Sequence, residues 1–151
     1  MRGDSARWPL AAEAISLPPS PGSVRLARDY VRVLLRRLGC EPLVEAAAVG
    51  VTELVTNVVL HARTPMTVGV RLSGRGEVRI EVADGSAVPP QPRAYGPTSG
   101  TGRGLLLLGS ASTAWGVERA GPDDGKVVWF LPASDLAAGD SGRSGSGGTR
   151  K

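Results

Sequence analysis

The segment from Ala46 to Leu60 is apolar on nearly every side, and Glu53 is its only charged residue. A helix that is apolar all round is expected to be buried, and a buried carboxylate without a partner is costly. Glu53 and Asn57 are four residues apart, so they share one face of that helix. The segment therefore predicts a core helix that points two polar groups into one space, where something polar is expected to bind.

The chain has 151 residues, of which 41% are hydrophobic, which is enough for one domain with a sizeable core. The 15 residues from Ala46 to Leu60 are too few for a membrane span, and the first residues lack a signal-peptide pattern. We therefore expect a cytoplasmic protein that does not enter a membrane. One cysteine, Cys40, and one histidine, His61, exclude a disulfide framework and a zinc site, so any metal needs oxygen ligands.

The net charge of +4 comes from arginine, because only Lys126 and Lys151 of the 18 basic residues are lysine. This balance favours acidic partners. Direct nucleic-acid binding is not expected, because it needs clustered basic residues with exposed aromatics, and the aromatic residues are few. Four arginines recur on one side of a predicted helix and mark either a solvated face or a docking stripe for an acidic protein: Arg25, Arg28, Arg32 and Arg36.

Hydrophobic periodicity predicts the order of the elements. We expect a short strand around Glu13 to Leu17, a helix from Pro21 to Leu38 with Ser20 as its N-cap, and a helix from about Glu41 to Ala62. Four further strands are expected, in two pairs separated by turn residues: Met66–Leu72, Val78–Val82, Thr113–Arg119 and Lys126–Leu131. Residues 1–14 are predicted to be a flexible N-terminus, 15–132 one folded domain, and 133–151 a disordered tail rich in glycine and serine.

Two further features are candidates for binding. Asp84 continues the inward face of the strand that holds Val78, Ile80 and Val82, so its carboxylate is expected to point toward the core. The run Gly100–Gly104 leads into four leucines and predicts a glycine turn at a helix start, preceded by a proline-rich loop of the length typical of lids.

Together these groups predict a nucleotide site. The backbone N–H groups of a glycine turn bind phosphate, an amide oxygen such as that of Asn57 suits magnesium, and a carboxylate such as Asp84 accepts hydrogen bonds from a base amine. Singly, each has a structural explanation: an ion pair for Glu53, helix packing for Asn57, an Asx turn at Asp84 and a hinge at the glycines. The glycine run completes neither the dinucleotide fingerprint nor a Walker motif.

Three stretches resemble motifs of the GHKL ATPase superfamily, which has the Bergerat fold, and most closely those of its small anti-sigma-factor serine kinases. Glu53 to Ala62 resembles the N box, Asp84–Gly85–Ser86 the first glycine box, and Gly100 to Leu105 the second. The resemblance covers roughly residues 17–132 and implies an α/β two-layer sandwich, the histidine-kinase-like ATPase fold, with a mostly antiparallel sheet packed on helices.

The resemblance also implies a function. By this resemblance, Glu53 would be the general base, Asn57 would coordinate magnesium between the ATP phosphates, and Asp84 with Gly85 would bind adenine. The second box would line the phosphates with Gly100, Thr101, Gly102, Arg103, Gly104 and Leu105. Arg103 either approaches the terminal phosphate or is an exposed lid residue, and His61 is expected to be a helix-end residue rather than a ligand.

The activity so implied is that of an ATP- and magnesium-dependent serine/threonine kinase in a partner switch, which phosphorylates an antagonist protein and binds a sigma factor. A homodimer is a candidate assembly. Two other functions stay open, an ATP-binding module that sequesters a partner without phosphotransfer and a domain that has lost nucleotide binding. The chain departs from the family pattern at Ser86, where a second glycine is usual, and in the last strand, where a threonine is usual but Gly125-Lys126-Val127-Val128 offers only lysine and valine.

Overall fold

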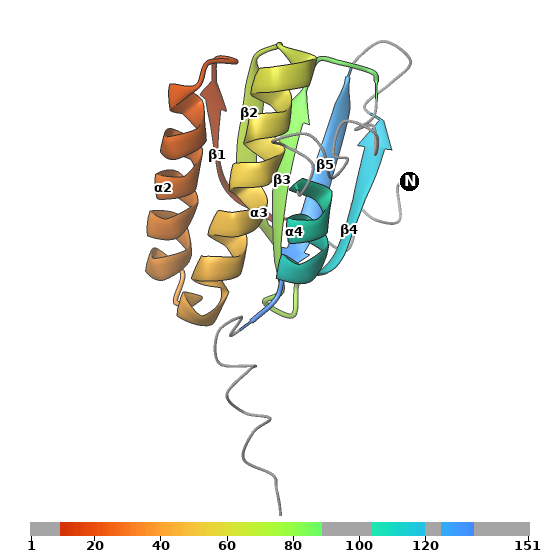
Figure 1. The fold of residues 1–151 in the computed structure, drawn as a ribbon. Coiled ribbons are helices and arrows are strands. Elements are labelled where there is room, and N and C mark those ends of the chain that lie inside the picture. Colours follow the sequence, from red (N-terminus) through yellow and green to blue (C-terminus); the bar gives the residue numbers. More distant parts are fainter. Residues whose placement is uncertain (1–9, 89–103, 120–124, 135–151) are drawn as a thin grey trace, which may run out of the picture.

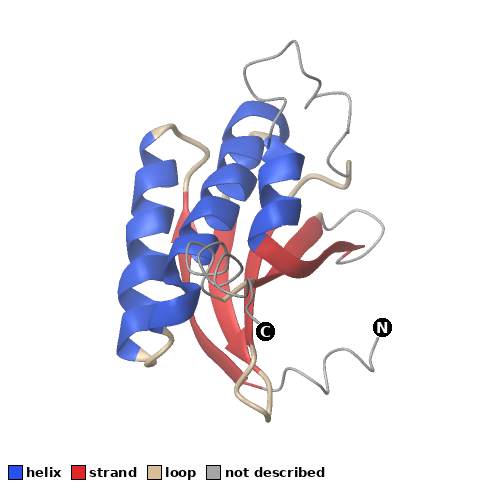
Figure 2. Cartoon of the chain, turned by 60° about the horizontal axis from the view of Figure 1, so that its bottom comes forward, coloured by secondary structure: helices blue, strands red, loops and turns tan. Residues whose placement is uncertain are grey.

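The protein is an α/β two-layer sandwich, as predicted. The computed structural model describes residues 10–88, 104–119 and 125–134. In these residues five strands form one antiparallel sheet in the order β1-β2-β3-β5-β4. The helices lie together on one face of this sheet (Figure 1), and the separation into a helical layer and a strand layer is clear when the molecule is turned (Figure 2). The strands are β1 (Leu10–Leu17), β2 (Met66–Leu72), β3 (Val78–Asp84), β4 (Ser112–Arg119) and β5 (Lys126–Pro132).

The first strand and the first helix differ slightly from the prediction. Strand β1 begins at Leu10 rather than near Glu13, because it pairs with β2 along its whole length, with a bulge between Ala11 and Glu13. Helix α2 (Gly22–Arg37) has Pro21 in the N-cap position, one residue later than expected. As predicted, it ends before Gly39, whose φ of 76° is the left-handed conformation that favours glycine.

The predicted second helix consists of three consecutive segments. A short 3₁₀ turn (Glu41–Leu43) leads into α3 (Val44–Asn57), and a π-helical turn (Val58–Ala62) completes it. By length and composition, the 22 residues of Glu41–Ala62 could cross a membrane. The segment from Ala46 to Leu60, on which the sequence-based expectation rested, is too short to do so. However, 50% of the apolar window is buried inside the domain, which is the behaviour of a core helix packed on a sheet.

The hydrophobic core lies between the helices and the inward face of the sheet. Inward strand positions contribute fully buried side chains, and α3 packs on them with Val51 and Val55, neither of which is exposed at all. The helix approaches β5 so closely at Gly50 that a Cβ there would overlap the ring of Phe130. Gly50 thus fixes the distance between α3 and β5. A third helix, α4 (Gly104–Ala111), lies beside α3 in the same layer (Figure 1).

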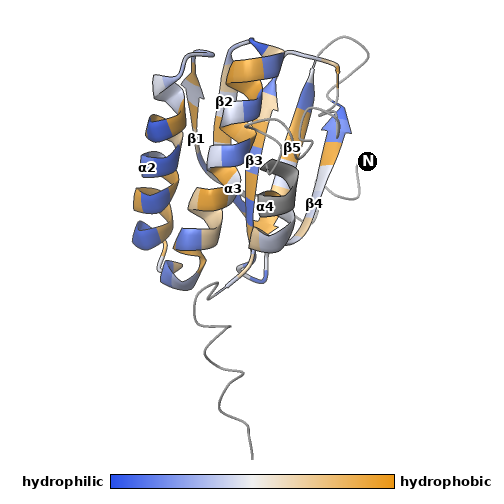
Figure 3. Cartoon of the chain, in the orientation of Figure 1, coloured by the Kyte–Doolittle hydropathy of each residue, from blue (hydrophilic) through white to orange (hydrophobic). Residues whose placement is uncertain are grey.

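The exposed side of α2 carries charged residues with a few apolar ones among them, and the helix shows both blue and orange bands in Figure 3. The Arg25 side chain is 81% exposed, and both Arg25 and Arg32 lie within 4.0 Å of Asp29. Arg36 contacts Glu41 at 3.3 Å. Exposed ion pairs of this kind contribute little to stability, so the arginines fit the solvated-face alternative as well as a docking role.

The other face of the sheet carries a group of charged residues around Arg79. Its guanidinium lies 2.9 Å from the Glu81 carboxylate, 3.2 Å from that of Glu118, and 4.6 Å from the centre of the Trp129 ring. Arg79 is therefore only 3% exposed, although its strand position points away from the helices. The indole covers the guanidinium, and the neighbouring carboxylates neutralise it.

Candidate functional site

The candidate site begins at the end of β3, where Asp84 points toward the helical layer. Its neighbours on the inward face, Ile80 and Val82, are almost completely buried, and Asp84 itself is 7% exposed. This agrees with the parity of the strand in the sequence. A carboxylate buried to this extent needs partners, and the structure supplies two kinds.

The first partner is Lys126, the residue paired with Asp84 across β3 and β5. Its ammonium Nζ lies 3.1 Å from Asp84 Oδ1 and 3.0 Å from Oδ2. The side chain of Lys126 is 7% exposed and that of Asp84 is 2% exposed. Nζ also lies 3.4 Å from the backbone carbonyl oxygen of Ser86. Lys126 is therefore a component of the site, although the sequence showed it only as part of the strand in which the family usually has a threonine.

Gly125 makes this pairing sterically feasible. Its φ is 87°, and a Cβ at this position would overlap the backbone carbonyl of Asp84. The chain thus enters β5 in a conformation that only glycine adopts easily, directly against the end of β3. This close approach fixes Lys126 opposite the carboxylate.

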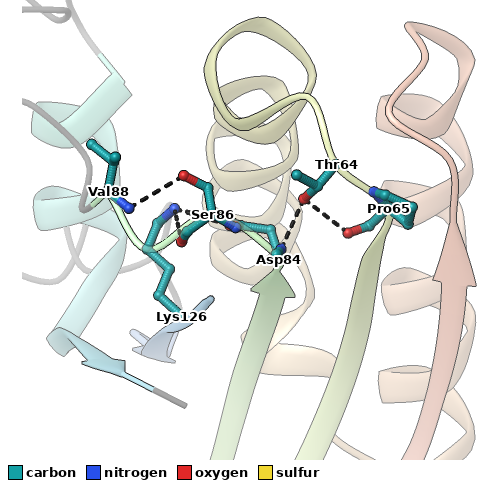
Figure 4. A network of polar contacts seen from close by, with 7 residues as sticks. Thr64, Pro65, Asp84, Ser86, Val88 and Lys126 are labelled. Carbon is teal, nitrogen blue, oxygen red and sulfur yellow. Dashed lines mark hydrogen bonds and ion pairs between the residues drawn. The ribbon is translucent and has the colours of Figure 1, made fainter. Parts of the chain in front are cut away.

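The second kind of partner is the loop that follows the strand. The Ser86 backbone N–H donates to Asp84 Oδ1 at 2.7 Å, which is the Asx turn considered as the structural explanation for this aspartate. The Gly85 N–H donates to the Thr64 hydroxyl at 2.8 Å, and the Val88 N–H to the Ser86 hydroxyl at 3.2 Å. Figure 4 shows these contacts as one continuous network. The loop is therefore anchored by side chains from two directions.

Glu53 and Asn57 lie on α3 with the expected helical spacing, so they share a face. Both are half-buried, whereas the sequence predicted a fully buried carboxylate. Thr52 and Thr56 on that side of α3, and Val59 just after it, are also only partly buried, so the described residues do not cover this side of the helix completely. Desolvation by partial burial still raises the pKa of the Glu53 carboxyl above its ordinary value.

The helix changes character directly after Asn57. The π turn Val58–Ala62 ends at Arg63, which has a left-handed backbone with φ of 55° and donates its N–H to the carbonyl of Val58. His61 is exposed in this turn, which confirms its position at the helix end. The turn directs the chain to Thr64, so the end of the N-box helix is joined to the network around Asp84. Nothing in the sequence marked the π turn or Thr64.

Most of the glycine-rich stretch lies outside the described residues. This applies to four of the predicted site residues, Gly100, Thr101, Gly102 and Arg103. Gly104 and Leu105 open helix α4, which confirms that the glycine stretch precedes a helix. The phosphate-binding role assigned to this stretch remains a prediction.

The described residues offer groups that suit both ATP and magnesium. Asp84 supplies an acceptor for a base, and Asn57 supplies a neutral oxygen suited to a hard cation. The described residues hold no cluster of three or more histidine, cysteine, aspartate or glutamate side chains, so a magnesium ion here would depend on phosphate oxygens and water. That is the usual situation of magnesium in nucleotide sites, and the described residues are compatible with both groups.

Comparisons with known proteins agree with this fold. The model of the histidine kinase-like ATPase domain family matches residues 17–131, so the chain belongs to that family. The family implies ATP binding, and its Bergerat architecture is the one described above. A Streptomyces coelicolor protein of uncharacterized function is 39% identical over 88 residues, which cover 56% of this chain and 82% of that protein.

Two solved structures share the fold. One contains the RsbU and RsbW domains of Rv1364c from Mycobacterium tuberculosis, with a TM-score of 0.58 and 17% identity over 82% of this chain; the present chain spans only 33% of that chain. The other is the SiaB–SiaC complex from Pseudomonas aeruginosa, with a TM-score of 0.51 and 16% identity. The match covers 87% of the present chain and 95% of the chain in that structure. At these identities the similarity concerns the fold.

Proposed function

We propose that this protein is an ATP- and magnesium-dependent serine/threonine kinase of the anti-sigma-factor type. In this proposal it phosphorylates an antagonist protein in the cytoplasm, and phosphorylation of the antagonist leaves the kinase free to bind a sigma factor. The observation that carries the proposal is the half-buried Glu53 beside Asn57 on one face of α3, with a raised carboxyl pKa.

The raised pKa suits a general base. A carboxylate whose charged form is destabilised by desolvation accepts a proton more readily than an ordinary glutamate. In our proposal Glu53 accepts the proton of the serine or threonine hydroxyl of the partner, and Asn57 holds the magnesium ion. Asp84 with Gly85 contacts the base, and Gly100 to Leu105 surround the phosphates. Magnesium would neutralise charge on the phosphates during transfer.

A protein partner is proposed from two observations. The Pseudomonas relative in fold was solved as a complex of SiaB with SiaC. In this chain, the outer side of α2 exposes Leu26 and Val33, at 56% and 54%, between arginines. Apolar side chains within a basic surface suit an acidic protein better than nucleic acid, which agrees with the composition.

Phosphotransfer to candidate antagonists tests this function. The protein is incubated with labelled ATP, magnesium and each antagonist, and the wild type is compared with Glu53→Gln and Asn57→Ala. We expect transfer by the wild type and a loss of about a hundredfold or more in Glu53→Gln, because general-base catalysis is worth roughly that much. Thermal melting with and without ATP and magnesium shows whether nucleotide binds.

The outcomes separate the alternatives. ATP stabilisation without transfer to any antagonist would replace the kinase by an ATP-binding module that sequesters its partner. Transfer by Glu53→Gln at the wild-type rate would remove Glu53 from the role of base. If ATP with magnesium leaves the melting temperature unchanged, the nucleotide-binding function is wrong.

A further inference from the structure

The pairing of Asp84 with Lys126 affects which base the site can recognise, because several acceptor positions of the carboxylate are already occupied by groups of the protein. A carboxylate offers about four acceptor positions, two on each oxygen. Oδ1 accepts from the Ser86 N–H at 2.7 Å and from Lys126 Nζ at 3.1 Å, so both of its positions are filled. Oδ2 lies 3.0 Å from Nζ in an ion pair and accepts no hydrogen bond among the described residues. The acceptor positions that remain for a ligand are therefore on Oδ2.

The ammonium group of Lys126 also has an N–H donor that is only weakly engaged within the protein. Lysine carries three N–H donors, and Nζ donates to Asp84 Oδ1 while forming an ion pair with Oδ2. It also faces the Ser86 carbonyl at 3.4 Å, which is the longest contact in the network and near the limit for a hydrogen bond. This donor is the one most easily transferred to a ligand.

A lone carboxylate and this pair recognise different bases. A carboxylate alone accepts a hydrogen bond from a 6-amino group and repels a 6-oxo group, whose oxygen is also an acceptor. With Lys126 beside it, the site holds an acceptor and a movable donor at the same point. A 6-amino purine can donate to Oδ2, and a 6-oxo purine can accept from Nζ in place of the Ser86 carbonyl.

We propose that Lys126 is a specificity-determining residue of the base site and that it gives the site relaxed selectivity for purine nucleotides, so that 6-oxo purines bind alongside 6-amino purines. The inference rests on the proposed function, because it takes Asp84 as the residue that contacts the base. It concerns the donor next to Asp84, which the family pattern does not contain. The partial neutralisation of Asp84 also weakens its preference for an amine, since hydrogen bonds to charged groups are the stronger ones.

The test is calorimetric titration of the full chain, in magnesium, with ATP and with inosine triphosphate (ITP), which differs from ATP only at purine positions 1 and 6. For the wild type we expect ITP to bind within about tenfold of ATP. For Lys126→Thr we expect ITP to lose about thirtyfold relative to ATP, because the donor is gone and the carboxylate is unpaired. Arg75→Thr removes the same charge from the exposed β2–β3 turn and is expected to leave the ratio unchanged.

A measurement on the wild type alone covers the case in which Lys126→Thr does not fold. Purine riboside triphosphate carries hydrogen at position 6, and we expect it to bind more weakly than both ATP and ITP. A wild type that binds ATP but prefers it to ITP by more than about a hundredfold would overturn the inference and leave the proposed function intact. So would ITP binding no better than the 6-hydrogen analogue. Binding of none of the three nucleotides would overturn both proposals.

Discussion

Replacing Gly50 with alanine tests how tightly α3, the helix that carries Glu53 and Asn57, is seated on the sheet. An added Cβ would meet three ring carbons of Phe130 at separations of 3.0 Å or less, and this ring is fully buried. Overpacking of a core costs about 2 kcal/mol, whereas replacing a helical glycine by alanine gains about 1 kcal/mol. We therefore expect Gly50→Ala to destabilise the domain by about 1 kcal/mol.

A double-mutant cycle isolates the contact. Phe130→Leu removes the ring and is expected to cost about 2 kcal/mol by itself. In that background there is room for the methyl group, so Gly50→Ala is expected to stabilise by about 1 kcal/mol through helix propensity alone. The coupling between the two positions is then about 2 kcal/mol, which is within the range for residues in direct contact.

The assay is urea denaturation of the four proteins, with Gly109→Ala as the matched control. Gly109 also lies in a helix, but a Cβ there would have nothing within 4 Å, so alanine is expected to stabilise by up to about 1 kcal/mol. If Gly50→Ala stabilised the wild type as much as Gly109→Ala does, α3 would not be seated on β5 as described. A coupling below about 0.5 kcal/mol would lead to the same conclusion.

Three further predictions concern charged groups and the β5 entry. Burial raises the pKa of Glu53, so the folded protein holds its proton more strongly than the unfolded chain, and stability falls as pH rises from the unfolded pKa through the folded one. Glu53→Gln should therefore be more stable than the wild type at neutral pH and lose this advantage at acidic pH, in melts across a pH series; an advantage that grows on acidification would contradict the pKa assignment. Gly125→Ala should cost about 3 kcal/mol in urea denaturation, from a φ of 87° and the overlap with the Asp84 carbonyl, and a neutral effect would refute that backbone geometry. Arg79→Met should cost about 1 kcal/mol, because Glu81 loses its 2.9 Å contact with Arg79 but keeps Arg71 at 3.0 Å, and tryptophan fluorescence should change as the guanidinium leaves Trp129; a variant of unchanged stability and spectrum would show that the network is not formed in solution.

The sequence predicted the features that depend on local periodicity. Alternation through Val78, Ile80 and Val82 correctly placed Asp84 on the inward face, and the apolar run around Glu53 correctly predicted the core helix. In such cases the side-chain direction follows from a period of 2 or 3.6, which can be read without knowing the partner element.

The features that the sequence did not predict depend on the pairing of distant segments. The ion pair of Asp84 with Lys126 joins residues 42 positions apart and requires the register of β3 on β5, which no local pattern specifies. The burial of Arg79 was missed for the same reason, because Trp129 reaches it from the neighbouring strand. The partial exposure of Glu53 reflects how completely neighbouring segments cover α3, which is a property of tertiary packing.

The strand order also determines when in folding the base site can form. The sheet contains two local antiparallel pairs, β2 with β3 and β4 with β5, which meet only where β3 joins β5, and β1 extends the first pair along β2. Bringing Asp84 to Lys126 closes a loop of 42 residues, an entropic cost of about 3 kcal/mol that must be met before the contact stabilises anything. The site therefore assembles late, and substitutions at this pair should accelerate unfolding while leaving the rate of folding nearly unchanged.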